Sequence, residues 1–175
     1  RQDQLRVDLD DAPEQFVVPQ FADGGDHRVR DLAGEHLVRA VRPLKDNGLR
    51  WVDPDNWHIT LDFFGDQPND AAEVREMLRG IEGASVTLSL SGAGSFDKNV
   101  LWAGVHGHIT HLMLEPSRPH LTLARAGRRT RDPWLIPDAV HALSVYRGPE
   151  FEVSTISLVQ SFLGEGRGGG PRYEV

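Results

Sequence analysis

The sequence predicts an α+β fold built on antiparallel sheet, and three observations support this prediction. Helix-like and strand-like segments mix along the chain without the regular strand–helix–strand rhythm of a parallel sheet. Two runs with alternating apolar residues, Val86–Leu90 and Val100–Val105, are separated by a glycine-rich turn segment, which is typical of an antiparallel hairpin. The chain has 175 residues, of which 39% are apolar and 26% charged, and this suits one compact domain or two small lobes sharing a core.

The first half of the chain alternates between strand and helix signals. Residues 1–13 are polar and acidic, so we expect a loose tail followed by a single domain over residues 14–175. Apolar residues at helical spacing predict the two helices, and Asp26 and the capping-box pattern from Asp70 mark where they begin. The expected elements are a strand at Phe16–Val18, a helix at Val29–Leu44, a strand at Trp57–Phe64 and a helix at Ala71–Ile81.

The second half contains mostly strand signals around one short helix. The hairpin named above comes first, and the remaining segments are short alternating runs bounded by glycine, proline or charged residues. These are a strand at His120–Ala124, a helix at Pro137–Tyr146, one or two strands within Phe151–Leu163 and a last strand at Arg172–Val175.

Composition excludes several classes of protein. The chain has no cysteine, which excludes disulfides, thiolate zinc sites and cysteine nucleophiles. No apolar stretch approaches the roughly 20 residues of a membrane helix, and the segment from Arg1 lacks the apolar core of a signal peptide. We therefore expect a cytoplasmic protein without a membrane partner, and we expect a monomer. A formal charge of −7 argues against a long nucleic-acid footprint but not against a small site for one phosphate.

A short motif, His-x-Thr-Leu, occurs twice in strand-like runs and is the main functional signal. The first copy contains His58 and Thr60, and the second contains His120 and Thr122. Because side chains alternate along a strand, the His and Thr of each copy share one face while the residues between them point into the core. Two such strands facing each other would form a site with two imidazoles and two hydroxyls.

This set of groups suits hydrolysis of a phosphodiester. A histidine with a pKa near 6.5 exchanges a proton at neutral pH, so a pair can serve as acid and base. Threonine hydroxyls can hold the non-bridging oxygens of the phosphate during in-line attack, without a metal ion. One His-x-Thr alone usually has no function, whereas two copies in matching contexts favour catalysis.

The segments around the two motifs resemble a known family. Leu49–Gly65 and Pro119–Arg125, together with Val100–Val105, Ser157–Leu163 and Pro171–Val175, are similar to the LigT-like branch of the 2H phosphoesterases. These are RNA 2′,3′-cyclic phosphodiesterases that were first described as 2′-5′ RNA ligases. The resemblance covers most of the chain beyond about Val29.

The resemblance implies a fold, a reaction and roles for the two histidines. The implied fold is bilobal and pseudo-twofold, with two antiparallel-sheet lobes, helices on the outside and a central cleft. The implied reaction opens a 2′,3′-cyclic phosphate at an RNA end or on a nucleoside and leaves a 2′-phosphate, with no cofactor and no metal. By motif position, His58 is the proton donor and His120 the proton acceptor, with Thr60 and Thr122 on the phosphate.

Two further residues are weaker predictions for the site. Arg125 matches the run His-x-Thr-Leu-Ala-Arg and is a candidate phosphate ligand. Strict alternation places it on the face opposite His120, so it reaches the site only if the strand ends or twists near Ala124. Phe64 shares the face of His58 and can stack on a nucleobase, with burial between the lobes as the alternative.

Other interpretations stay open or are disfavoured. A phosphodiesterase acting on small cyclic nucleotides and a non-catalytic module that binds RNA ends are the alternatives. A third His-x-Thr, His108 to Thr110, lacks the following Leu and is interpreted as chance. His106, His108 and His111 are interpreted as surface histidines rather than a zinc site. The family resemblance implies a helix between Val105 and Pro119, and this sequence offers no clear pattern for one.

Overall fold

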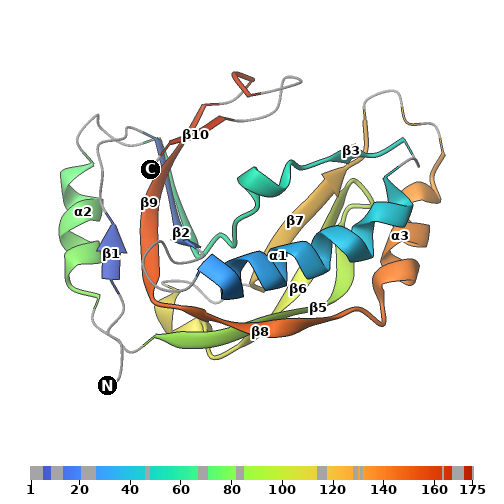
Figure 1. The fold of residues 1–175 in the computed structure, drawn as a ribbon. Coiled ribbons are helices and arrows are strands. Elements are labelled where there is room, and N and C mark those ends of the chain that lie inside the picture. Colours follow the sequence, from blue (N-terminus) through green and yellow to red (C-terminus); the bar gives the residue numbers. More distant parts are fainter. Residues whose placement is uncertain are drawn as a thin grey trace.

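A computed structural model describes residues 6–8, 14–20, 27–45, 48–66, 71–81, 85–113, 118–127, 130, 132–162, 164–166 and 172–174. Within these residues the strands form two five-stranded sheets, and the helices lie mainly on the faces of those sheets (Figure 1). The prediction of an α+β fold with antiparallel sheet is therefore confirmed.

The first sheet collects strands from both ends of the chain. Its strand order is β1-β9-β2-β4, with β10 paired on β9. Every pairing is antiparallel except that of β1 with β9. The strands are β1 (Arg6–Asp8), β2 (Glu14–Gln20), β4 (Asp62–Asp66), β9 (Thr155–Phe162) and β10 (Arg172–Glu174).

The second sheet is antiparallel throughout, in the order β3-β7-β6-β5-β8. It carries the second His-x-Thr motif on β7. The strands are β3 (Arg50–Trp51), β5 (Val86–Phe96), β6 (Val100–Gly107), β7 (His120–Arg125) and β8 (Arg147–Val153).

Within the described residues, three helices and three single-turn 3-10 helices connect these strands. They are α1 (His27–Val41), η1 (Arg42–Leu44), η2 (Pro54–Asn56), α2 (Ala72–Arg79), η3 (Thr110–Leu112) and α3 (Leu135–Leu143). None of the helices in the described part of the chain has the length and apolar run needed to cross a bilayer.

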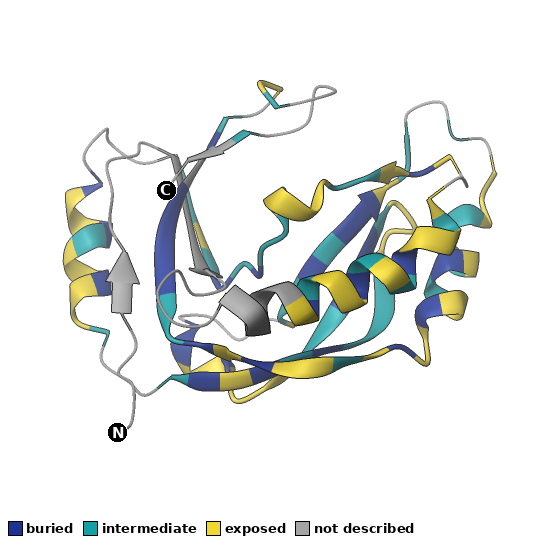
Figure 2. Ribbon diagram, viewed as in Figure 1, coloured by how far each residue is buried: buried dark blue, intermediate teal, exposed yellow. Residues whose placement is uncertain are grey.

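The helices cover the sheets through apolar stripes. On α1, Ala33, Leu37 and Val41 recur every four residues and are all buried, so this side of the helix packs onto the second sheet at β8. The opposite side of α1 is exposed, as the burial colours of Figure 2 show. In the same way, α3 packs against β5 and β6. The resulting core is dominated by leucine and isoleucine from both sheets, including the residues between each motif His and Thr.

The structure differs from the sequence prediction around the hairpin of β5 and β6. The glycine-rich segment predicted as the turn continues β5 as far as Phe96, and the turn itself is confined to Asp97–Asn99. Asp97 and Lys98 have φ angles of 48° and 55°, the left-handed pair that a tight hairpin turn requires. Glycine in this strand allows a close approach, because a Cβ on Gly94 would collide with the ring of Trp102.

Other boundaries also differ. Three residues of the predicted polar tail, Arg6–Asp8, form β1, while the rest of residues 1–13 lies outside the described residues. Asp26 and Asp70, the predicted helix caps, lie outside them as well. Between Val105 and Pro119 the described residues contain only the short η3 helix, in agreement with the weak helical pattern there.

Candidate active site

The first His-x-Thr motif lies where the chain passes from one sheet to the other. Ile59 forms a single antiparallel bridge with Leu121 of β7, and three residues later the chain enters β4 of the first sheet. The strand predicted over 57–64 is therefore shorter than expected, since its first half contacts the second sheet and its second half the first sheet.

The bridge brings the two motifs together on one face. Ile59 and Leu121 are 1% and 0% exposed, so both point into the core. In the register of this bridge His58 lies opposite Thr122, and Thr60 lies opposite His120. The residues on either side of Ile59 and Leu121 therefore share the other face. His58 and His120 are diagonal neighbours there, and diagonal neighbours on antiparallel strands lie about 7–8 Å apart.

Both imidazoles are held in the same way by the backbone. Nδ1–H of His58 donates to the carbonyl oxygen of Asn56 at 2.9 Å, and Nδ1–H of His120 donates to that of Arg118 at 2.9 Å. A carbonyl can only accept, so Nδ1 carries the proton and Nε2 carries the lone pair in each neutral ring. Asn56 is the last residue of η2. Asp53 immediately precedes this helix, and its carboxylate accepts a hydrogen bond from the backbone N–H of Asp55. The turn thus places the acceptor for His58.

Burial and nearby positive charge act on the His58 imidazole. Burial lowers the pKa of His58 below its ordinary value; the hydrogen bond to the Asn56 carbonyl opposes this, and the positive charges of His120 and Arg125 lower the pKa further. The neutral form of His58 is therefore favoured in the free protein.

Arg125 reaches this face because of a β-bulge. Leu101 pairs with Ala124 but Trp102 pairs with Thr122, so Leu123 is an extra residue on β7. Leu123 and Ala124 are consequently both fully buried, and alternation resumes with Arg125 exposed. The sequence analysis predicted that Arg125 reaches the site only if the strand ends or twists near Ala124. The bulge changes the alternation at that point.

Two aromatic rings lie against His120. The Phe96 ring is 4.8 Å from the His120 ring, centroid to centroid, with an interplanar angle of 82°. The Trp102 ring is 6.1 Å from His120 and 5.5 Å from Phe96. Neither aromatic was predicted as part of the site, although pairing the hairpin correctly would have placed Phe96 opposite Val100, at the end of β7.

Phe64, which the sequence suggested for base stacking, lies on β4 of the first sheet. It is half-buried and packs against the hydrophobic core. Its neighbour Phe63 is 66% exposed. The alternation from His58 to Phe64 is interrupted, because only the residues from Asp62 onward belong to β4.

The third His-x-Thr does not join this arrangement. His108 is exposed after the end of β6, Thr110 begins η3, and Ile109 between them is buried. Across the described residues, no three side chains of His, Asp or Glu come together as a metal site would require. His106 and His111 are exposed like His108.

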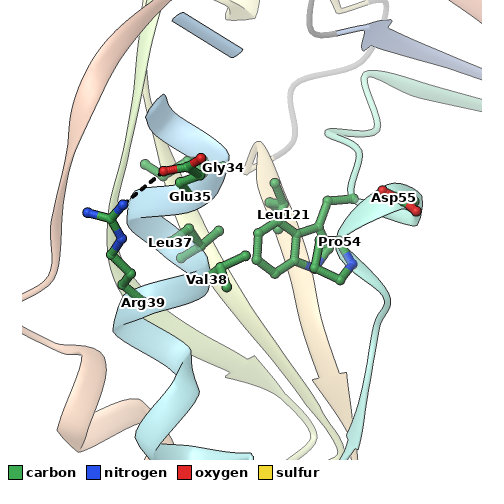
Figure 3. A pocket seen from close by; sticks show the side chains of 10 residues that line it. Gly34, Glu35, Leu37, Val38, Arg39, Pro54, Asp55 and Leu121 are labelled. Atoms are coloured by element: carbon green, nitrogen blue, oxygen red, sulfur yellow. Dashed lines mark hydrogen bonds and ion pairs between the residues drawn. The ribbon is translucent and has the colours of Figure 1, made fainter. Parts of the chain in front are cut away.

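A cavity of about 570 Å³ lies on the other side of the motif strand (Figure 3). Leu121, whose side chain points away from His120, forms part of its wall, and α1 forms the opposite wall. The residues that line the cavity are Gly34, Glu35, Leu37, Val38, Arg39, Pro54, Asp55, Trp57, Leu90 and Leu121. None of the motif histidines or threonines is among them, so this cavity is separate from the paired motifs.

Solved structures share this fold over almost the whole chain. E. coli LigT, crystallised with ATP, superposes with a TM-score of 0.63 at 23% identity, covering 93% of both chains. A protein from Thermus thermophilus superposes with a TM-score of 0.60 at 24% identity, covering 93% of this chain and 94% of that one. These superpositions show that the chain has the same fold as these proteins.

Comparison at the level of sequence identifies the family. Residues 31–102 match the LigT like Phosphoesterase family. The protein named RNA 2′,3′-cyclic phosphodiesterase from Methanothermobacter thermautotrophicus is 32% identical over 157 residues, which cover 74% of this chain and 83% of that protein. A protein of the same name from Aeropyrum pernix is 31% identical over 138 residues, covering 66% and 78%. The chain belongs to the LigT-like phosphoesterase family.

Proposed function

We propose that this protein is an RNA 2′,3′-cyclic phosphodiesterase that opens the cyclic phosphate at an RNA 3′ end and leaves a 2′-phosphate. Its archaeal relatives bear that name, and the family match agrees with it. The observation that carries the proposal is the Ile59–Leu121 bridge, which brings the two His-x-Thr motifs to one face.

In the proposed mechanism His120 is the base. Its Nδ1–H is held by the Arg118 carbonyl, so Nε2 takes a proton from water. The water oxygen forms a bond to phosphorus, and the bond from phosphorus to the ribose 3′ oxygen breaks in line with it. The hydroxyls of Thr60 and Thr122 and the guanidinium of Arg125 bind the non-bridging oxygens and stabilise the charge that develops on them.

His58 is the acid, donating its Nε2 proton to the departing 3′ oxygen. Burial and the neighbouring positive charges favour the neutral ring in the free protein, which opposes this role. A bound phosphodiester anion favours the protonated form and so raises the pKa of His58 in the complex. If the anion does not raise it enough, the roles are exchanged, with His58 as base and His120 as acid.

The remaining parts of the proposal concern shape and setting. The two sheets act as two lobes related by a pseudo-twofold axis, with a central cleft between them, within one domain over residues 14–175. The second His-x-Thr lies on β7, and the first lies where the chain crosses from the second sheet to the first. The protein acts as a monomer in the cytoplasm. Size-exclusion chromatography with light scattering tests the monomer, and a dimer at micromolar concentration would refute it.

Hydrolysis of adenosine 2′,3′-cyclic phosphate in the presence of EDTA tests the function directly. We expect adenosine 2′-phosphate as product, with undiminished rate in the chelator. An RNA oligonucleotide ending in a 2′,3′-cyclic phosphate should be a better substrate than the nucleoside. Tight binding of that RNA end without turnover would instead indicate an RNA-end-binding module, and a preference for the nucleoside would indicate a small-molecule phosphodiesterase.

A further inference from the structure

We propose that Arg50, together with Arg125, binds the next phosphate of the RNA chain, the one on the 5′ oxygen of the terminal ribose. This second anion subsite favours an RNA end over a nucleoside cyclic phosphate. The inference rests on the proposed function and deepens it. The sequence analysis considered Arg125 as a ligand of the reacting phosphate and did not include Arg50.

The strand register places Arg50 on the same face as the paired motifs. Arg50 of β3 lies directly opposite Arg125 of β7, and Arg125 lies opposite Val100 of β6 (Figure 1). Residues directly opposite each other on antiparallel strands share one face. Val100 precedes Trp102 by two residues, and Trp102 pairs with Thr122 of the second motif. Both arginines therefore lie on the face that carries Thr122.

In the part of the chain that the structure describes, the two arginines have no counter-ion. Both are exposed, and none of the ion pairs among these residues includes either of them. Like charges directly opposite each other on neighbouring strands destabilise a sheet. An anion bound by both guanidinium groups would offset that repulsion, and the planar guanidinium group matches the geometry of a phosphate.

The position of Arg50 is defined by a turn beside it. Its Cδ is 3.8 Å from the place where a Cβ on Gly127 would lie, so the stem of the side chain rests against that glycine. Gly127 and Thr130 form the turn, in which the N–H of Gly127 donates to the Thr130 hydroxyl and the N–H of Thr130 donates to the Gly127 carbonyl. The stem is thus supported while the charged end reaches solvent.

The arginine pair lies at the His58 end of the motif face. Along β7 the order is His120, Thr122 and then Arg125. In the register of the Ile59–Leu121 bridge, His58 lies opposite Thr122, so the pair is nearer to His58 than to His120. Arg125 follows Thr122 by about 7–10 Å, because a strand rises about 3.3 Å per residue and the bulge shortens the path.

The chemistry of the substrate brings a second phosphate to that end. In the proposed mechanism His58 protonates the departing 3′ oxygen, so the ribose lies on the His58 side of the phosphorus and the attacking water on the His120 side. The next phosphate of the RNA chain is attached to the 5′ oxygen of this same ribose. It therefore lies toward the His58 end, where the arginine pair is. A nucleoside 2′,3′-cyclic phosphate has no phosphate at this position.

Two competing explanations make different predictions. Arg50 could bind the reacting phosphate together with Arg125, and its loss would then weaken every cyclic phosphate substrate. It could also be a solvated charge on β3, which is the edge strand of its sheet, and its loss would then affect no substrate. The proposed subsite matters only for a substrate with a 5′ phosphate.

The test compares adenosine 2′,3′-cyclic phosphate with the same nucleotide carrying a 5′ phosphate. We expect the wild-type protein to have a KM about 5- to 50-fold lower for the 5′-phosphorylated substrate, as a charge-assisted contact weakened by solvent would give. Arg50→Gln should remove most of this difference, while KM for the unphosphorylated nucleotide and kcat for both change less than about twofold. Arg50→Lys should keep part of it, since lysine supplies the charge but not the planar fork.

The matched control is Arg42→Gln. It removes the same charge from an exposed residue of η1, which continues α1, and α1 forms the wall of the cavity on the other side of the motif strand. This variant should change neither substrate. Equal losses on both substrates for Arg50→Gln would overturn the subsite and assign Arg50 to the reacting phosphate. Unchanged kinetics for Arg50→Gln, or a wild-type KM that does not respond to the 5′ phosphate, would also overturn it.

Calorimetric titration separates this proposal from the proposed function, because it needs no turnover. The ligands are adenosine 2′-phosphate and adenosine 2′,5′-bisphosphate. If the wild-type protein hydrolyses neither cyclic phosphate, tighter binding of the bisphosphate that is lost in Arg50→Gln still supports the subsite. Equal binding of the two nucleotides, or binding of neither, refutes it.

Discussion

Removing either motif histidine should reduce turnover strongly, while removing the histidine of the third motif should not. The substitutions are His58→Ala, His120→Ala and His108→Ala. His58 and His120 share the face formed by the Ile59–Leu121 bridge, whereas His108 is exposed beyond the end of β6. The three substitutions remove the same side chain from the same kind of motif, so His108→Ala controls for loss of an imidazole as such.

The expected magnitude follows from the role of each ring. A positioned proton-transfer group contributes about 10²–10⁴-fold, which corresponds to about 2.7–5.4 kcal/mol in activation free energy. Each substitution also deletes one hydrogen bond, from His58 to Asn56 or from His120 to Arg118. Such a bond stabilises the fold by about 0.5–1.5 kcal/mol, which leaves a protein of ordinary stability folded.

The assay is single-turnover hydrolysis of adenosine 2′,3′-cyclic phosphate, with thermal unfolding as the control for folding. Because the two rings act as a unit, the double variant should lose less than the product of the single losses. We would abandon the two-histidine mechanism if His120→Ala retained wild-type turnover, and we would reassign the second motif if His108→Ala lost activity in its place.

Four more predictions concern the pKa of His58 and the packing behind the site. Burial and positive charge lower the pKa of His58, so its NMR titration should fall below about 6.5 in the free protein, and the Arg125→Gln variant should move it upward; a pKa above 6.5 would contradict this. The pKa of His58 is lower in the folded than in the unfolded protein, so its contribution to the unfolding free energy is complete above about pH 6.5 and decreases as the pH falls through the folded pKa. Urea titrations of wild type and His58→Gln at pH 5 and pH 8 would detect this decrease. Gly94→Ala should destabilise the protein by about 1–3 kcal/mol, since its methyl group collides with the Trp102 ring, and an unchanged melting temperature would refute that packing. Leu121→Ala, at a fully buried position, should cost about 2–5 kcal/mol in urea unfolding, and a cost below 1 kcal/mol would contradict its place in the core.

Much of the secondary structure could be predicted because its signal is local. The apolar residues of α1 recur at helical spacing, and Ala33, Leu37 and Val41 among them are buried, whereas Leu32 is 61% exposed. β7 begins at His120 as the alternation indicated, and β6 begins at Val100. The turn of the β5–β6 hairpin was placed too broadly, because the glycines of β5 serve a close contact with Trp102 rather than a turn.

Elements that depend on distant partners could not be predicted in the same way. The two residues of β3 are strand only because they pair with β7, and β1 is strand because it pairs with β9. Neither segment is long enough to show an alternating pattern of its own. For the same reason, the change of sheet between Ile59 and β4 leaves no trace in a sequence that alternates across it.

The candidate site could be recognised from the sequence, because two His-x-Thr motifs lie in strand-like runs where alternating side chains share a face. How that face is completed depends on contacts between distant segments. The bulge at Leu123 turns Arg125 toward the histidines, and the pairing of β5 with β6 brings Phe96 against His120. Burial and the neighbouring positive charges then lower the pKa of His58. Alternation is a property of a few consecutive residues, whereas register, bulges and burial arise from contacts between segments far apart in the chain, so a local pattern does not contain them.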